Sequence, residues 1–456
     1  MTKPVQAAGS TKSVVMAMFF ISLLFFILGF VTWLNGSLIP FLKIVCDLND
    51  FQALWVTFAF YIAYTVMALP SAAILSRIGY KNGMTLSLGV MAVGALLFIP
   101  AAKSSYYGLF LLALFTLATG MTLMQTAINP YIVCIGSRDS AAMRISVMGL
   151  FNKGAGIVVP MIFSALILSG MEQYSGTALA ALDQTAKEIL RAELSSRLIY
   201  PYAVMAAGLV LFMLLIHFSK LPELDVEDNQ SATEVRRFGV FQFPQLVLGA
   251  VALFAYVGVE VIAGDTIGLY GHHLGVNHFA VLTSYTMSFM ALGYLLGATC
   301  IPRWLSQKAA LLLSAVSGMG FTAGVILSSA TDTTMSHYLI AWVGVPEVPN
   351  TVMFLALLGL ANALVWPSIW PLALEGLGKY TASGSALLIM GIAGGALLPM
   401  IYGHFSDTGS AQSAYWVLLP CYVIILLYAV KGHAIRSWKG GSALAQEATE
   451  QSEVLL

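Results

Sequence analysis

The chain has 456 residues, of which 59% are hydrophobic and only 9% are charged, whereas a soluble globular chain carries about 25% charged residues. This composition excludes a soluble enzyme with a solvated surface and predicts a chain that lies in a membrane. Lys and Arg together number 21, as do Asp and Glu, so no nucleic-acid partner is expected. The four cysteines have no spacing typical of a metal site or a disulfide framework.

The apolar residues fall into twelve runs, each close to the roughly 20 residues that cross a bilayer as a helix. The runs are continuous and lack the alternation of barrel strands, so they predict an all-α fold. The predicted spans are 14–36, 51–75, 83–101, 106–133, 145–169, 199–219, 242–268, 279–302, 308–329, 350–374, 381–404 and 412–431.

Positive charge between the spans predicts the orientation, because Lys and Arg are retained on the cytoplasmic side. Fifteen of the 21 Lys and Arg residues fall on the side of the N-terminus and five on the other side. Both termini are therefore expected in the cytoplasm. The polar stretch 220–240 divides the spans six and six, which predicts bundles at 1–219 and 241–432 and a cytoplasmic tail at 433–456.

The two halves contain similar sequences in the same order. The segment 156–163 (GIVVPMIF) is echoed by 395–402 (GALLPMIY), and Asn129-Pro130 by Trp366-Pro367. The starting positions differ by 239 and 237 residues. Such offsets indicate an internal duplication, and repeated bundles are typical of transporters with a site between the halves.

Three charged residues stand well inside predicted spans: Lys153, Glu260 and Asp265. A charge at this depth costs at least about 2.5–3.5 kcal/mol and is by default a functional hypothesis. Glu260 and Asp265 are five residues apart, about 140° on a helix, so we expect separate roles for them. Asp265 could instead cap a helix or reach interfacial water.

Lys153 requires a carboxylate if its ammonium is buried, and the intramembrane carboxylates lie in the other half. An ion pair between the halves is therefore expected, and its making or breaking could bias which side of the membrane is open. The alternative is that Lys153 reaches the interface or binds carbonyl groups.

Amide and aromatic side chains inside the spans form a second candidate set. Amides can hold neighbouring sugar hydroxyls, and an aromatic face can cover the C–H side of the ring. Hydrogen bonds between helices are the alternative use of the same groups. The predicted sugar contacts are Asn35, Gln125, Asn129, Asn152, Asn362 and Trp366.

Other sequence features give weaker indications of function. No GxxxxGK[ST] loop is present, so transport driven by ATP hydrolysis in this chain is not expected. His272, His273 and His278 lie between the seventh and eighth spans, where a solvated outer loop is expected.

Several longer motifs resemble the major facilitator superfamily and, within it, the fucose/glucose/galactose sugar-permease family. They are Leu34-Asn35, 51–53 (FQA), 77–81 (RIGYK), 125–130 (QTAINP), Phe151-Asn152 and 256–261 (YVGVEV). The resemblance covers nearly all of 14–435. The seventh-helix motif and Asn362 resemble the glucose/galactose and N-acetylglucosamine branch.

Two positions depart from the fucose-permease pattern, which has an Asp after the first-helix Asn and a Glu opening the fourth-helix motif. Here they are Gly36 and Gln125. Proton coupling by the Asp and Glu of the fucose-permease pattern therefore cannot be transferred to this chain. A gap-free overlay of the first and seventh helices places Gly36 on Asp265, which suggests that the carboxylate role has moved to the other half. The branch includes both proton- and sodium-coupled members.

The sequence thus predicts a twelve-helix permease of the major facilitator fold, without enzymatic activity, resident metal or cofactor, in the bacterial inner membrane. We expect it to act as a monomer and to import a hexose together with H⁺ or Na⁺. The predicted coupling residues are Glu260, Lys153 and Asp265. A uniporter or exporter of the same fold and a membrane-bound sugar sensor are the alternatives.

Overall fold

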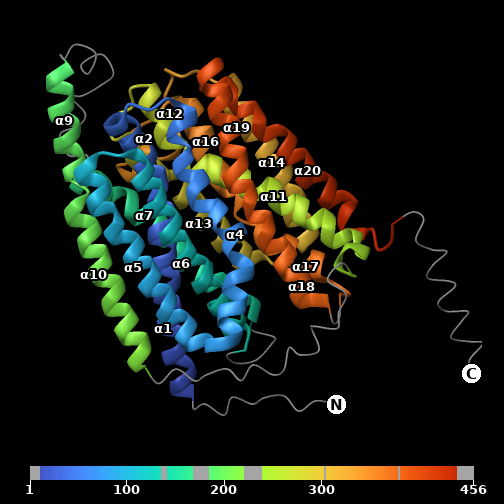
Figure 1. The fold of residues 1–456 in the computed structure, drawn as a ribbon. Coiled ribbons are helices and arrows are strands. Elements are labelled where there is room, and N and C mark those ends of the chain that lie inside the picture. Colours follow the sequence, from blue (N-terminus) through green and yellow to red (C-terminus); the bar gives the residue numbers. More distant parts are fainter. Residues whose placement is uncertain are drawn as a thin grey trace, which may run out of the picture.

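The computed structural model describes residues 11–134, 141–167, 184–219, 239–301, 304–377 and 380–438. Some side chains within these ranges, including that of Asn129, lie outside the description. The described chain is helical throughout, and twelve of its helices are long and apolar enough to cross a membrane. Each of the twelve predicted spans overlaps one of them. Figure 1 shows these helices running side by side in one bundle.

The first half contains nine described helices. They are α1 (Thr11–Trp33), α2 (Asn35–Cys46), α3 (Asp50–Ala53), α4 (Trp55–Ile78), α5 (Tyr80–Ser104), α6 (Tyr107–Cys134), α7 (Ala141–Ile167), α9 (Gln184–Ser196) and α10 (Ile199–Phe218).

The second half has ten described α-helices, mostly shorter than those of the first half, and several short 3₁₀ turns. Its α-helices are α11 (Pro244–Asp265), α12 (Ile267–His273), α13 (Leu282–Cys300), α14 (Gln307–Leu327), α15 (Thr334–Leu339), α16 (Asn350–Asn362), α17 (Val365–Leu374), α18 (Thr381–Met390), α19 (Gly394–Thr408) and α20 (Leu418–Val430). Its 3₁₀ turns are η4 (Gly239–Gln242), η5 (Phe279–Val281), η6 (Ala341–Val343), η8 (Gly391–Ala393), η9 (Ser413–Val417) and η10 (Gly432–Ala434).

Two membrane spans extend by ten residues or more beyond their predicted bounds. The apolar helix of the first span continues past a break at Leu34 to Cys46, ten residues beyond the predicted end. The sixth span is preceded by α9, so the pair runs from Gln184 to Phe218. A search for apolar runs does not detect α9, because only one face of this helix is buried and the other carries charged residues.

Helix breaks recur at matching places in the halves. The first span breaks at Leu34 between α1 and α2, and the seventh breaks at Thr266 between α11 and α12. The tenth breaks between α16 and α17. A broken helix leaves backbone groups free of the regular ladder, and such breaks in transporters lie where helices face the site between repeats.

The helices of residues 11–219 pack chiefly against one another, as do those of residues 239–438. Between the halves, α7 packs on α13, α4 on α19 and α2 on α12. In Figure 1, α2 and α12 lie at the upper end of the bundle and α17 and α18 lie towards the lower end. The predicted linker falls mostly outside the described residues, as does most of the predicted tail, so the division into two bundles remains a prediction.

Candidate functional site

A largely buried ion pair joins the two halves. The Nζ of Lys153 on α7 lies 2.6 Å from Oε1 of Glu260 on α11, and the two side chains are only 8% and 12% exposed. This is the ion pair expected from the sequence. Two charges removed from water attract strongly but have lost their hydration, so removing one partner leaves a costly uncompensated charge.

The ring of Trp33, the last residue of α1, completes the surroundings of Lys153. The ammonium lies 4.2 Å from the ring centroid, a cation–π contact. The Nε1–H of Trp33 donates to Oδ1 of Asn152 at 3.2 Å, while Nδ2 of Asn152 donates to the carbonyl of Phe25 at 3.4 Å. Both ends of the Asn152 amide are therefore engaged within the first half, and a sugar would have to compete with these contacts.

Asp265 occupies a different face of α11, as the 140° separation predicts. Its side chain is fully buried, and Thr57 Oγ1 on α4 donates to Oδ2 at 3.4 Å. Its other oxygen has no hydrogen-bond partner among the residues that the structure describes. A fully buried carboxylate with so few donors is unfavourable as an anion. A bound proton or a cation would relieve that cost.

The other predicted sugar contacts lie on both halves, and tyrosines hold two of them. Gln125 Nε2 on α6 donates to the Tyr64 hydroxyl at 3.1 Å, and the Tyr422 hydroxyl donates to Oδ1 of Asn362 on α16 at 2.8 Å. Asn35 is 1% exposed, and its Nδ2 has no partner among the described residues. Buried amides with unused donors are suited to a polar ligand.

Trp366 on α17 is half-buried. Its ring centroid lies 5.5 Å from that of Trp370 and 6.3 Å from that of Tyr256, one helical turn before Glu260. Trp366 therefore lies beside the helix that carries the ion pair. The Asn129 side chain lies outside the description, so its place in the site remains a prediction.

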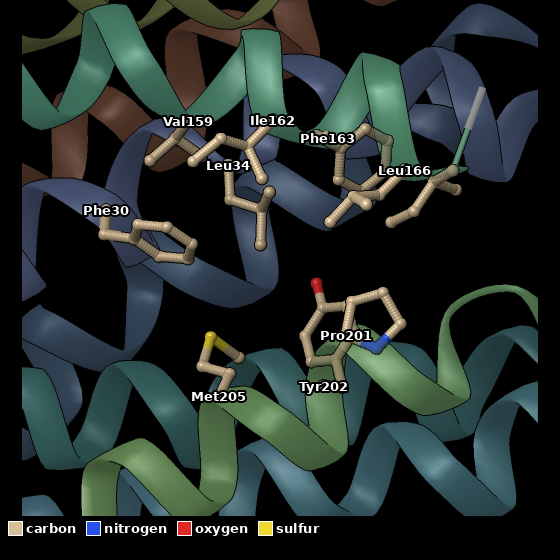
Figure 2. A pocket seen from close by; sticks show the side chains of 10 residues that line it. Phe30, Leu34, Val159, Ile162, Phe163, Leu166, Pro201, Tyr202 and Met205 are labelled. Carbon is tan, nitrogen blue, oxygen red and sulfur yellow. The ribbon is translucent and has the colours of Figure 1, made fainter. Parts of the chain in front are cut away.

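A pocket elsewhere in the bundle does not match the predicted sugar site. It lies between α1, α2, α7 and α10, and Figure 2 shows it lined by side chains such as Phe30, Leu34 and Phe163. None of the predicted sugar contacts lines it. The few polar groups there, such as the Tyr202 hydroxyl, are too sparse to bind several sugar hydroxyls.

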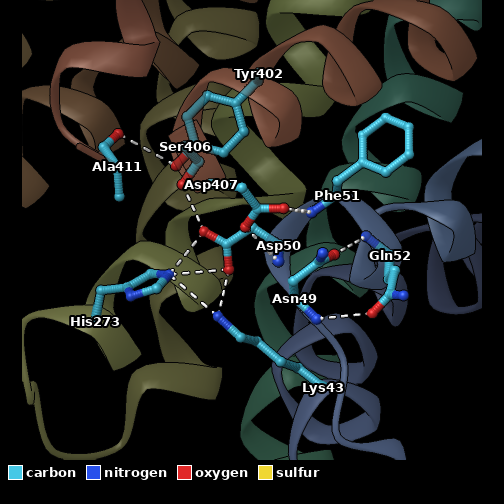
Figure 3. Close-up of polar contacts among 10 residues, drawn as sticks. All are labelled: Lys43, Asn49, Asp50, Phe51, Gln52, His273, Tyr402, Ser406, Asp407 and Ala411. Carbon is cyan, nitrogen blue, oxygen red and sulfur yellow. Dashed lines mark hydrogen bonds and ion pairs between the residues drawn. The ribbon is translucent and has the colours of Figure 1, made fainter. Parts of the chain in front are cut away.

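A second polar cluster closes the α2/α12 end of the bundle. Asp50, at the start of α3, forms an ion pair with Lys43 of α2, and its carboxylate lies 2.9 and 3.0 Å from His273 Nε2 of α12. The Ser406 hydroxyl of α19 also donates to Asp50. Figure 3 shows the Asp50 carboxylate surrounded by these three side chains. The Asp50 carboxylate thus receives donors from both halves.

A second carboxylate also forms hydrogen bonds between the halves, but it belongs to the second half and accepts from the first. Asp407 of α19 accepts hydrogen bonds from the backbone amides of Asp50 and Phe51 at 2.9 and 3.0 Å (Figure 3). Asn49 caps the same helix locally by accepting from the Gln52 amide at 2.7 Å. The first amides of a helix have no partner within it, so Asp407 satisfies them from the other half.

His272 lies beside this cluster but is not part of it. Its pKa is lowered from the ordinary value near 6.5 to about 4, chiefly by burial of the ring and also by the neighbouring charge of Lys43. Its ring packs edge-on against Phe279 of η5 at 4.9 Å. The expectation of a solvated histidine loop is wrong for His272, because it lies on α12 and its ring is partly buried, whereas His273 on the same helix is exposed.

The two halves approach each other closely at Gly36. A Cβ there would lie 2.3 Å from Thr283 Oγ1 and 2.9 Å from the Gly264 carbonyl oxygen. A Cβ at Gly268 would in turn lie 2.9 Å from the Gly36 carbonyl oxygen. Position 36 therefore has no room for a carboxylate in this conformation, whereas Asp265 lies next to Gly264 on α11.

Sequence reasoning missed the roles of Trp33, Thr57, Asp50, His273 and Asp407. Trp33 is one apolar residue among many in its span, and Asp50 and Asp407 lie just outside predicted spans, where a charge needs no explanation. The signal that could have found Asp50 is the sequence Asn49 to Gln52, which has the pattern of a capping box and marks a helix start.

The fold and this geometry can be compared with known proteins. The family model described as "Major Facilitator Superfamily" matches residues 21–399. The chain belongs to this family. The twelve-helix fold predicted from the sequence is thereby confirmed, and so is the resemblance on which the prediction partly depended.

Curated relatives of the chain are named as sugar transporters. It is 33% identical over 429 residues to a glucose/galactose transporter of Brucella abortus, covering 93% of this chain and 95% of the relative. It is 32% identical to a putative glucose/galactose transporter of Helicobacter pylori, covering 90% and 95%. It is 27% identical to an L-fucose-proton symporter of Haemophilus influenzae, covering 94% and 98%.

Among solved structures, the fucose:proton symporter of Escherichia coli matches with a TM-score of 0.69 at 24% identity, covering 91% of this chain and 98% of that one. The xylose transporter of E. coli in an inward-open conformation matches with a TM-score of 0.64 at 12% identity, covering 96% and 99%. At these identities the likeness concerns the fold.

Proposed function

We propose that this protein is a secondary active transporter that imports a hexose, with glucose, galactose and N-acetylglucosamine as candidates, together with H⁺ or Na⁺. The observation that carries the proposal is the buried Lys153–Glu260 ion pair between the halves of a major facilitator chain. The glucose/galactose transporters among its relatives support a sugar as the cargo.

The sugar binds between the halves, in contact with amides and an aromatic ring. Asn35, Gln125, Asn129 and Asn152 would offer amides from the first half, and Asn362 and Trp366 an amide and an indole ring from the second half. The tyrosine partners of Gln125 and Asn362 fix the orientation of each amide and leave its other end for a sugar hydroxyl.

Coupling depends on the buried charges. A cation drives uphill transport only if it binds the two facing states with different affinity. Asp265 is the proposed cation carrier, because its carboxylate is buried with a single weak donor among the described residues. Glu260 and Lys153 respond to it through the ion pair between α7 and α11, so that neutralising a carboxylate alters the contact between the halves.

Transport proceeds by alternating access of two six-helix bundles, residues 1–219 and 241–432, in a protein that functions as a monomer in the bilayer. With both termini in the cytoplasm, the α2/α12 end faces outwards. The Asp50 and Asp407 contacts then represent a closed outer side. The protein is a multi-pass component of the bacterial inner membrane.

The test is uptake of labelled glucose, galactose and N-acetylglucosamine into proteoliposomes, with pH and sodium gradients imposed separately. We expect one of the sugars to accumulate above its external concentration with one of the gradients. Equal final levels with and without gradients would indicate a uniporter. Binding without transport would indicate a sensor and overturn the proposal.

A further inference from the structure

Trp33 lies in a notch formed by one glycine from each half. A Cβ on Gly156 of α7 would lie 2.8 Å from Cδ1 of the indole, and a Cβ on Gly264 of α11 would lie 2.7 Å from Cζ3. The two ends of the ring therefore contact opposite halves. Trp33 is only 2% exposed, and Met287 of α13 packs with it.

The face of the same ring covers the Lys153 ammonium at 4.2 Å, while Nε1–H is used by Asn152, the neighbour of Lys153. These contacts restrict where the ammonium can lie. They direct it at Glu260 and exclude water from one side of the pair. A cation–π contact is worth about 0.5–1 kcal/mol at an exposed site and about 2 kcal/mol or more when desolvated.

We infer that Trp33 is a positioning residue for the coupling site. Its ring holds the Lys153 ammonium against Glu260 only while α11 lies against α1 and α7. That this is a coupling site rests on the proposed function, whereas the contacts of Trp33 with Lys153 and the two glycines do not depend on it. When the halves separate at this level, Gly156 stays with Trp33 in the first half and Gly264 leaves. The ring then loses its contact with Gly264, and the Lys153–Glu260 ion pair is held less firmly.

A chemical readout that needs no sugar can test this inference. A lipid-soluble carbodiimide adds to a protonated carboxyl and not to one held as an anion by an ammonium. Labelling of Glu260 in the purified full chain, followed by mass spectrometry at pH 7, therefore reports how firmly Lys153 holds it. The other titratable groups that interact with Glu260 stay in place in every variant; they are Asp265, Tyr61, Tyr256, Tyr294 and Tyr422.

We expect Trp33→Leu to raise the labelling rate of Glu260 by at least about threefold, because it removes both the ring face and the N–H donor. Trp33→Phe keeps a ring face and should raise the rate less. Gly264→Ala should act in the same direction as Trp33→Leu by displacing the ring. If Trp33→Leu does not fold, Trp33→Phe and Gly264→Ala decide the question.

The matched control is Gly154→Ala on α7, where a Cβ would meet no atom of the described residues within 4 Å beyond the nearby backbone of its own helix, so labelling should stay at the wild-type rate. Wild-type labelling in Trp33→Leu and Gly264→Ala would overturn the inference, as would a Trp33→Phe rate equal to that of Trp33→Leu. Counterflow of labelled glucose, galactose and N-acetylglucosamine is measured separately on wild type. Its failure would count against the proposed function and not against the role of Trp33.

Discussion

The carboxylate of Asp407 accepts a hydrogen bond from the backbone amide of Asp50 at 2.9 Å, across the boundary between the two halves. The start of α3 therefore depends on the second half for part of its capping. In return, the Asp50 side chain accepts from His273 and Ser406 of the second half. Separating the halves at this end breaks both sets of bonds together, which favours two distinct states over a continuum.

We predict that Asp50→Asn opens the α2/α12 end. The variant loses charge-assisted hydrogen bonds to Lys43 and His273, each worth about 1.5–3 kcal/mol. Loss of one such bond shifts the equilibrium between closed and open states by roughly ten- to a hundredfold. Electron paramagnetic resonance distances between labels at positions 106 and 338, both exposed and in different halves, should lengthen in a background with the four cysteines replaced.

Asp47→Asn is the matched control for this experiment. Asp47 follows α2, and its side chain is 77% exposed in an ion pair with Arg191 at 3.0 Å. An exposed pair contributes about 0–1 kcal/mol, so the distance distribution should match that of wild type. An unchanged distribution in Asp50→Asn would refute the closing role of Asp50.

Acidification should destabilise the α2/α12 end of the bundle through His272. Its pKa in the folded protein is about 4, below the ordinary value of 6.5, so the folded state favours the neutral ring. This contribution to stability is fully present above pH 6.5 and is lost as the pH falls towards 4. We expect the melting temperature to fall over this interval, and to fall less in His272→Gln. Parallel pH profiles for the two proteins would exclude this role.

Glu260→Gln should abolish uphill accumulation of sugar while leaving exchange between compartments. The amide keeps the shape of the side chain but cannot hold the Lys153 charge, so the cation gradient no longer biases the two states. Counterflow and gradient-driven uptake of the transported sugar, measured in the same proteoliposomes, separate the two activities. Intact accumulation in this variant would remove Glu260 from the coupling site.

A double-variant cycle should reveal how strongly the ion pair is coupled. Lys153→Met and Glu260→Gln each leave one buried charge without its partner, at an expected cost of about 3–5 kcal/mol in the free energy of unfolding. The double variant has no unpaired charge and should be more stable than either single one. Thermal unfolding of the purified proteins measures this, and additive losses would contradict a direct interaction.

Asp265→Asn should distinguish the two candidate cations. The amide cannot take up a proton, so if H⁺ is the coupling ion, uptake driven by a pH gradient should disappear while counterflow persists. If Na⁺ is coupled at Asp265, sodium-driven uptake should disappear instead. Thr57→Val, which removes the one described donor to Asp265, should alter the pH dependence without abolishing transport. Gradient-driven uptake that survives in Asp265→Asn would assign cation carriage to another group.

Much of the architecture followed from the sequence, because lipid leaves few options for an apolar run of 20 residues. The same logic identified Lys153 and Glu260, since a buried ammonium requires a carboxylate and few are available inside the spans. The predictions were weaker wherever a helix was amphipathic or a charge lay near a span end. The missed helix α9 and the misjudged His272 of α12 are of this kind.

The closing contacts of Asp50 and Asp407 could not have been derived from one sequence. They depend on which loop of one half meets which helix end of the other, and this is decided by packing over hundreds of residues. The same holds for Trp33, whose role comes from Gly156 and Gly264, two glycines more than 100 positions apart. A pattern within a single helix carries no information about such a notch.

The crowding at Gly36 also limits how such a transporter can change during evolution. An aspartate restored there, as in the fucose-permease pattern, would collide with the Thr283 hydroxyl and the Gly264 carbonyl. The change would have to be accompanied by substitutions on α11 and α13, and the intermediates would have an outer side that closes poorly. In this packing, a carboxylate at position 36 on α2 and the carboxylate of Asp265 on α11 are thus alternatives that no single substitution interconverts.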